Sequence, residues 1–204
     1  MLFNDTYNEL SKQSKGVYKE RGSKFVAYAY KILSKEDAKI KIQHIKKTEH
    51  GANHYCYAYV IYKDQSFWKI DDDGEPSSTA GKPILRQIRS NNLTNSIIIV
   101  ARYFGGIKLG ISGLIRSYKT AAANAINNSE IIHKYIKEQF LVSFSQQDIN
   151  IVMSLIKKYN LQIISTDLSI NSKISFTINR NKSDRIISIF KQYNNIKIEH
   201  EKTI

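Results

Sequence analysis

"SIIIVARYFGGIKLG", residues 96–110, is an apolar run that ends in an arginine, two aromatic residues and a glycine-rich turn. The run Ile97–Ala101 has no alternating polar positions, which is typical of a strand buried on both faces. A helix is expected from about Gly113, so the glycines connect a strand to a helix. This unit predicts a sheet covered by helices, with Arg102 and Tyr103 at the end of a buried strand.

The residues before this unit complete a layered α+β domain of order ββαββαβα. Two extended segments turn near Gly22, and a helix opens at Ser34, where Asp37 three residues later gives a capping-box pairing. Further elements are expected as strands at 54–62 and 66–70 and as a short helix around 83–90.

The residues after it read as βαββαβ, the split βαβ order of ferredoxin-like folds. A strand at 138–145 precedes a helix at 146–160, which has Met153 among its apolar positions. Two strands then turn at Asn171–Ser172, and a second helix follows with Asn181 as its N-cap. We therefore predict two domains, 1–135 and 136–204.

Composition indicates a soluble, cytoplasmic protein. The chain has no apolar stretch approaching the roughly 20 residues of a membrane span, and its first residues lack the pattern of a signal peptide. The lone cysteine, Cys56, can form no internal disulfide and is expected to be a buried core residue, as is its neighbour His54. Nothing in the sequence indicates an obligate oligomer.

The formal net charge is +13, and 22 of the 31 basic residues lie in residues 1–137. Such a field attracts phosphate-rich polymers, so RNA is a natural partner. An alternative is compositional, because 24 lysines against 7 arginines can simply reflect a lysine-rich solvated surface.

Residues 71–116 hold six of the nine glycines and four of the seven arginines. Arginine forms a bidentate fork with phosphate that lysine cannot form, and free N–H groups at the start of the helix favour an anion. Two alternatives remain: the arginines pair with nearby acids, or the glycines serve packing alone. The predicted phosphate-binding residues are Arg102, Tyr103, Gly105, Gly106, Lys108, Gly110, Arg116, Lys82 and Arg86.

Established catalytic and nucleotide motifs are absent from this block. Pro83 occupies the Ser/Thr position that a P-loop needs, and the glycine spacing is not that of a dinucleotide site. No acid is placed to orient His54 towards Cys56. The alternating Tyr55, Tyr57 and Tyr59 either stack on bases or, more simply, cover the sheet. We predict no catalytic residues, no metal and no cofactor.

Residues 71–85, "DDDGEPSSTAGKPIL", followed by "IIIVARYFGGIKLGISGLIRSY", resemble the IMPACT/YigZ family, with Ser78 and Ser112 where the family usually has glycine. The resemblance implies a ribosomal-protein-like N-terminal domain similar to elongation factor G domain IV and a C-terminal ferredoxin-like domain. It also implies a role in regulating translation for eukaryotic relatives and nucleic-acid binding for bacterial ones. The acids that it makes characteristic are Asp72, Asp73 and Glu75.

Three functions follow as hypotheses. The first is a non-catalytic protein that binds RNA or the ribosome and regulates translation, with a translation-related protein as a further partner. The second is an enzyme or sensor that binds a phosphorylated small molecule in the glycine-rich cleft. The third is a protein–protein adaptor.

Overall fold

The computed structural model describes residues 5–204, which separate into two compact units. The first unit comprises residues 7–134, and the second comprises residues 135–204 with Asp5 and Thr6. The predicted domains, 1–135 and 136–204, concern independent folding and stay a prediction. Residues 1–4 of the first domain lie outside the described residues.

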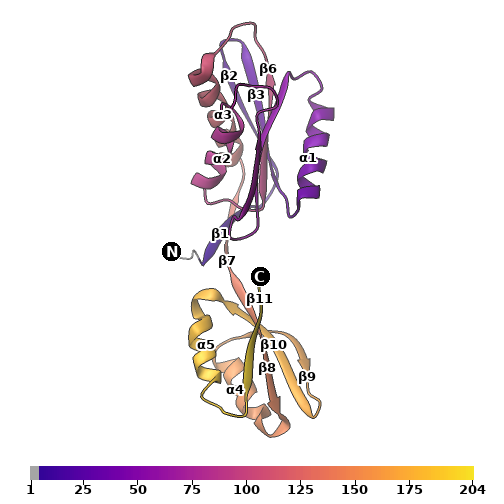
Figure 1. Cartoon of the computed structure of the whole chain (residues 1–204), viewed down its shortest axis with the longest axis vertical. Helices are drawn as coiled ribbons and strands as arrows, with labels where there is room; N and C mark the ends of the chain where they lie inside the picture. The colour runs from indigo at the N-terminus through magenta and orange to yellow at the C-terminus, as the bar shows by residue number, and fades with distance from the viewer. Residues whose placement is uncertain (1–4) are drawn as a thin grey trace. The chain divides into compact units, whose positions relative to one another are not determined.

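A five-stranded antiparallel sheet forms the centre of the first unit. Figure 1 shows α1 on one face of this sheet and α2 with α3 on the other. Ile98 and Val100 point to the α2/α3 core, whereas Ile97 and Ile99 belong to the α1 core. The strand is continuously apolar because both faces are buried. The sheet order is β2 (Ser14–Glu20), β3 (Ser23–Lys31), β6 (Ser96–Tyr103), β4 (His54–Ile61) and β5 (Phe67–Asp71).

The helices of this unit are α1 (Lys35–Thr48), α2 (Gly81–Ser90) and α3 (Gly110–Asn127). The capping box at Ser34 and Asp37 is confirmed. The predicted start of α3 at Gly113 is wrong by three residues: the left-handed turn into the helix lies at Gly110, whose φ is +69°. The tyrosines of β4 cover the sheet beneath α1, where Tyr57 and Tyr59 are buried.

Two strands that the sequence analysis did not predict, β1 (Thr6–Leu10) and β7 (Ile131–Tyr135), pair as a small ribbon. Glu9 of β1 is buried and forms ion pairs with Lys31 at 2.7 Å and Lys134 at 2.8 Å. Burial alone would raise the pKa of Glu9, but hydrogen bonds from Lys134, Lys31 and Asn95 outweigh it and lower the pKa to about 2.

The second unit has the predicted βαββαβ order and a four-stranded antiparallel sheet. Its helices lie on one face of the sheet and bury a separate apolar core (Figure 1). The sheet order β11-β8-β10-β9 is that of a ferredoxin-like fold, so the predicted α+β class is confirmed. The elements are β8 (Lys137–Ser145), α4 (Ile149–Lys158), β9 (Gln162–Asp167), β10 (Asn171–Asn179), α5 (Ser183–Phe190) and β11 (Lys197–Thr203).

Three local predictions in this unit are wrong. β10 already begins at Asn171, so the connection from β9 lies at 168–170. Met153 is 43% exposed, and Leu155 of the same helix is buried instead. A 3-10 turn at Arg180–Lys182 precedes α5 and makes Lys182 the N-cap in place of Asn181. Across the described residues, no helix has the length and apolar character needed to cross a membrane.

Candidate anion-binding pocket

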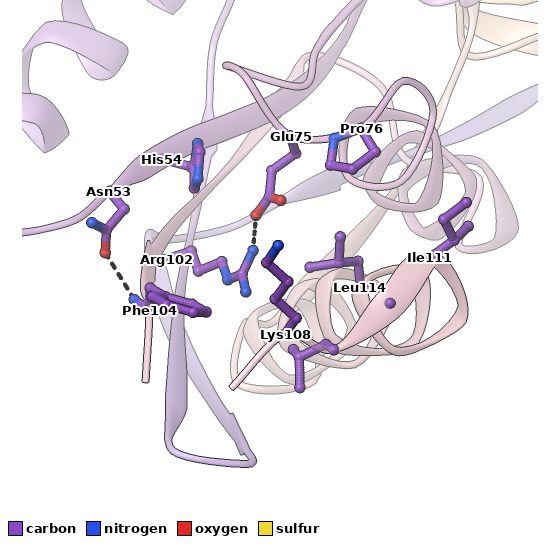
Figure 2. A pocket seen from close by; sticks show the side chains of 11 residues that line it. Asn53, His54, Glu75, Pro76, Arg102, Phe104, Lys108, Ile111 and Leu114 are labelled. Atoms are coloured by element: carbon purple, nitrogen blue, oxygen red, sulfur yellow. Dashed lines mark hydrogen bonds and ion pairs between the residues drawn. The ribbon is translucent and has the colours of Figure 1, made fainter. Parts of the chain in front are cut away.

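A pocket of about 470 Å³ opens at the end of β6, beside the start of α3 (Figure 2). We call it the Arg102 pocket. Its polar side chains come from β4, from the loop before α2, from β6 and from the loop before α3, and one wall is apolar. The lining residues are Asn53, His54, Glu75, Pro76, Arg102, Phe104, Lys108, Leu109, Gly110, Ile111 and Leu114.

The position of Arg102 follows from strand register. Arg102 pairs with Phe25 of β3 on one side and with His54 of β4 on the other, so all three side chains share the α2/α3 face. The guanidinium lies between two aromatic rings, 5.4 Å from the centroid of Phe25 and 5.6 Å from that of Phe104. These rings hold a charged group in place where only 5% of the residue is exposed.

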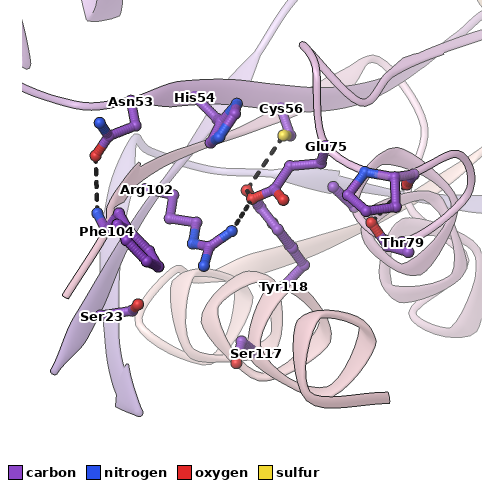
Figure 3. A network of polar contacts seen from close by, with 12 residues as sticks. Ser23, Asn53, His54, Cys56, Glu75, Thr79, Arg102, Phe104, Ser117 and Tyr118 are labelled. Carbon is purple, nitrogen blue, oxygen red and sulfur yellow. Dashed lines mark hydrogen bonds and ion pairs between the residues drawn. The ribbon is translucent and has the colours of Figure 1, made fainter. Parts of the chain in front are cut away.

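A chain of hydrogen bonds runs from Arg102 into the core (Figure 3). Arg102 Nη1 donates to Glu75 Oε1 at 2.5 Å, and the Tyr118 hydroxyl donates to the same oxygen at 2.7 Å. The Cys56 thiol lies 3.3 Å from the Tyr118 hydroxyl and 3.0 Å from the carbonyl oxygen of Asp72. Burial raises the pKa of both Cys56 and Tyr118, which keeps the thiol and the phenol protonated.

One donor of Arg102 has no partner. Its Nε is buried and forms no hydrogen bond with any residue of 5–204, although Nη1 is paired. Arg102 and Lys108 both line the pocket (Figure 2). Lys108 is exposed and forms no ion pair within the described chain. No side chain caps the start of α3 at Gly110, so its first N–H groups add partial positive charge. These features together favour an anion.

Two of the three motif acids serve the loop before α2 and not the pocket. Asp72 accepts hydrogen bonds from the backbone N–H groups of Ser78, Ala80 and Gly81 and thereby holds the start of α2. Asp73 accepts from the N–H of Tyr55 at 2.7 Å, and its own carbonyl accepts from His54 Nδ1 at 2.8 Å. Of these acids, only Glu75 lines the pocket.

The structure brings together three of the nine predicted phosphate-binding residues: Arg102, Lys108 and Gly110. Tyr103 points to the opposite face of the sheet, where its hydroxyl donates to Glu49. Gly105 and Gly106 lie in the loop between β6 and α3, outside the pocket lining. Arg116 is in the second turn of α3, paired with Glu20, and Lys82 and Arg86 are exposed on α2.

The alternative that arginines pair with nearby acids is confirmed for Arg102, which pairs with Glu75. The apolar wall and His54 were not predicted from the sequence as pocket residues. The expectation that His54 is a buried core residue like Cys56 is wrong, because His54 is only half-buried and lines the pocket. The register that aligns it with Arg102 cannot be read from one strand. The missed lining residues are Asn53, His54, Pro76, Phe104, Leu109, Ile111 and Leu114.

The fold and the pocket define the class of protein. It is an α+β protein of two compact units, in which a buried arginine at the end of a strand lies beside the start of a helix. The family model of the Impact N-terminal domain matches residues 21–126, which contain every residue that lines this pocket. The chain belongs to the IMPACT family.

Individual relatives agree. The chain is 39% identical over 112 residues to "IMPACT family member YvyE" of Bacillus subtilis, a match that covers 55% of this chain and 52% of that protein. It is 32% identical over 151 residues to an IMPACT family member of Haemophilus influenzae, with 73% of each chain covered. A solved structure described as a hypothetical protein has a TM-score of 0.67 at 21% identity, covering 97% of this chain and 98% of that one, which supports the fold alone. The chain thus spans about half the length of the Bacillus relative.

Proposed function

We propose that this protein binds RNA without catalysis, that the Arg102 pocket holds a backbone phosphate, and that the complex acts in the regulation of translation. The observation that carries the proposal is the buried Nε of Arg102, which has no hydrogen-bond partner within residues 5–204 and belongs to a side chain that lines a pocket together with Lys108 and the start of α3. A phosphate oxygen is the acceptor that this donor lacks. We propose that the protein acts in the cytoplasm.

Charge supports a polymer as the ligand. Glu75 neutralises part of the charge of Arg102, so the pocket suits the single negative charge of a phosphodiester better than a dianion. The net charge of +13 would draw RNA to the molecule before any specific contact forms. The translational part of the proposal rests on the family, in which eukaryotic relatives are named "Protein IMPACT".

The proposal is non-catalytic because the buried groups next to Arg102 are poor nucleophiles. Burial raises the pKa of the Cys56 thiol, and the thiolate is the reactive form of cysteine. Its hydrogen bonds to Tyr118 and to the Asp72 carbonyl leave it inside the core.

A second candidate ligand is a phosphorylated small molecule, which the apolar wall favours. The pocket volume of about 470 Å³ lies in the usual range for small-molecule sites, and Phe104, Ile111 and Leu114 could hold an apolar moiety. Mass spectrometry of the purified native protein separates the two candidates: co-purifying RNA supports the first, and a stoichiometric phosphorylated compound supports the second.

The decisive test measures the affinity for a single-stranded RNA as a function of salt concentration. Lys108→Ala should weaken binding and flatten the plot of log affinity against log salt by about 0.7, the value for one lost phosphate contact. Arg102→Lys keeps the charge and the pairing with Glu75 but removes the Nε donor, so it should weaken binding with little change of slope.

The matched control is Lys157→Ala in the last turn of α4, which removes one exposed lysine from the second unit. Affinity and slope should stay close to those of the unmodified protein. Equal losses in Lys108→Ala and Lys157→Ala would mean that diffuse lysine charge binds the RNA, and the proposed pocket would be wrong.

A further inference from the structure

The opposite face of the first unit's sheet has a second hollow, between α1 and strands β2 and β3. Helix α1 packs on β6 and β4, and beside it a pocket of about 430 Å³ lies over β2 and β3. We call it the tyrosine groove. It shares no lining residue with the Arg102 pocket. Its lining residues are Gln13, Ser14, Lys15, Tyr28, Tyr30, His44, Ile45 and Thr48.

Two tyrosine rings form the floor of the groove. Tyr28 and Tyr30 are two residues apart on β3 and therefore share a face, with ring centroids 6.4 Å apart and planes inclined by 9°. The hydroxyl of Tyr28 donates to the carboxylate of Glu49, which fixes the ring, and the residue remains half-buried. A ring that is held in place by a hydrogen bond and is still partly exposed is a surface on which a base can stack with little loss of side-chain entropy.

An ammonium group lies over each of the two rings. Lys15 Nζ lies 5.0 Å from the Tyr28 centroid, and Lys41 Nζ lies 4.9 Å from the Tyr30 centroid. Lys15 is exposed and Lys41 is half-buried, and ammonium groups next to an aromatic ring attract the phosphates of a strand whose base stacks there.

The acid that faces the groove is Glu49. Burial alone would raise its pKa, but hydrogen bonds from Tyr103 and Tyr28 outweigh it and lower the pKa. Its charge is offset by Lys15, whose Nζ is 3.7 Å away. The edge of the groove therefore stays cationic overall, and it carries the side chains of Gln13 and His44, which can hydrogen-bond the edge of a base.

We propose that the tyrosine groove takes one unpaired nucleobase of single-stranded RNA, stacked on Tyr28, with Lys15 and Lys41 on the adjacent phosphates. The inference rests on the proposed function, because the ligand is the RNA that the Arg102 pocket is proposed to bind. It adds that the strand must be unpaired, since the bases of a duplex are stacked on one another and cannot enter.

The test compares two strands that share the same phosphates. A short oligouridylate and an abasic strand of equal length are titrated into the full chain, with fluorescence anisotropy as the readout. The unmodified protein should bind the base-bearing strand about 5-fold or more tightly than the abasic strand, which is the lower end for one stacked base. Equal affinities for the two strands would overturn the proposal that the groove takes a base, and would leave the proposed phosphate binding intact. Binding of neither strand would overturn both proposals.

Variants assign the preference to Tyr28. Tyr28→Leu keeps an apolar side chain without an aromatic face, so the preference for the base-bearing strand should vanish while abasic binding persists. Tyr28→Phe keeps the ring and should keep the preference, even though it loses the hydrogen bond to Glu49. Lys108→Ala should lower the affinity for the two strands by the same factor. Retention of the preference in a folded Tyr28→Leu protein, checked by circular dichroism, would show that the groove does not hold the base.

Discussion

The sheet of the first unit is covered by helices on both faces, whereas the sheet of the second unit carries its helices on one face. On the uncovered side of the second sheet, Gln139 and Ser175 hydrogen-bond to Glu201, whose side chain is exposed. In the first unit, by contrast, Arg102 and Glu75 meet inside the protein with 7% and 3% of their side chains exposed.

The difference shows which polar contacts depend on the surrounding core for their geometry. A polar group that faces water can lose its partner and gain a water molecule in exchange, so its contacts contribute little to stability. A buried charge has no such replacement, so its geometry is maintained by the whole core. Contacts of an exposed side chain such as Glu201 in the second unit should thus contribute little to stability, even where one partner, Ser175, is buried, whereas the first unit has contacts between two buried charges on which its fold depends.

The largest expected effect is that of Glu75→Ala. The substitution leaves the guanidinium of Arg102 buried without its carboxylate and removes the acceptor of Tyr118, so unfolding should become easier by about 3–5 kcal/mol. Urea unfolding followed by the fluorescence of Trp68, the single tryptophan, reports this unit directly. Glu201→Ala, followed by circular dichroism, should cost less than about 1 kcal/mol. Similar losses in both variants would contradict the comparison.

The next effect concerns the loop between β6 and α3. A Cβ on Gly105 would lie 2.0 Å from the carbonyl carbon of Gly22, so Gly105→Ala must separate two backbone segments and should cost about 3 kcal/mol. Gly106→Ala is the matched control, because a Cβ there meets nothing within 4 Å and only its φ of +87° is unfavourable, which costs about 1 kcal/mol. Thermal melts of both variants measure the difference, and equal melting temperatures would refute the close approach.

A third effect is a pH dependence confined to the first unit. The pKa of Glu9 is lowered from 4.5 to about 2, so its contribution to stability is complete above pH 4.5 and is lost as the pH falls towards 2. The expected loss is about 3 kcal/mol. Urea midpoints monitored through Trp68 should fall over this pH range in the unmodified protein. They should fall less in Glu9→Gln, and parallel curves for the two proteins would disprove the assignment.

The smallest effects distinguish two serines, Ser78 and Ser112, by their backbone conformation. Ser78 has a φ of +65°, so Ser78→Gly relieves strain and should stabilise the protein by about 0.5 kcal/mol. Ser112 lies in the first turn of α3, where Ser112→Gly should destabilise it by about 0.5 kcal/mol. Precise urea melts can resolve opposite signs, and a shared sign would mean that backbone conformation does not decide these positions.

Much of the fold could be predicted because its signals are local. The apolar run Ile97–Ala101 required a strand with two buried faces, and Ser34 with Asp37 marked the start of a helix. The ribbon of β1 and β7 escaped prediction because five-residue strands with mixed polar residues carry no periodicity that stands out.

Only part of the candidate site could be predicted from the sequence. Arginine and glycine composition pointed to the block that holds Arg102 and Lys108, but a composition cannot say which acid an arginine meets. The pairing with Glu75 depends on the register of β6 against β3 and β4 and on the course of the loop before α2. Arg116 shows the same limit, because its distance from the pocket follows from a helix start three residues earlier than expected.

The hydrogen-bond chain that ends at Cys56 allows the reactivity of this thiol to report on the Arg102 pocket. Cys56 is the single cysteine, it is fully buried, and it is joined through Tyr118 and Glu75 to the arginine of the pocket. A thiol reagent can react only when this part of the core opens, so the labelling rate of the native chain measures the free energy of that opening. An anion that settles against Arg102 should slow the labelling. Occupancy of the pocket could thus be followed at one sulfur atom, without a label attached to the ligand.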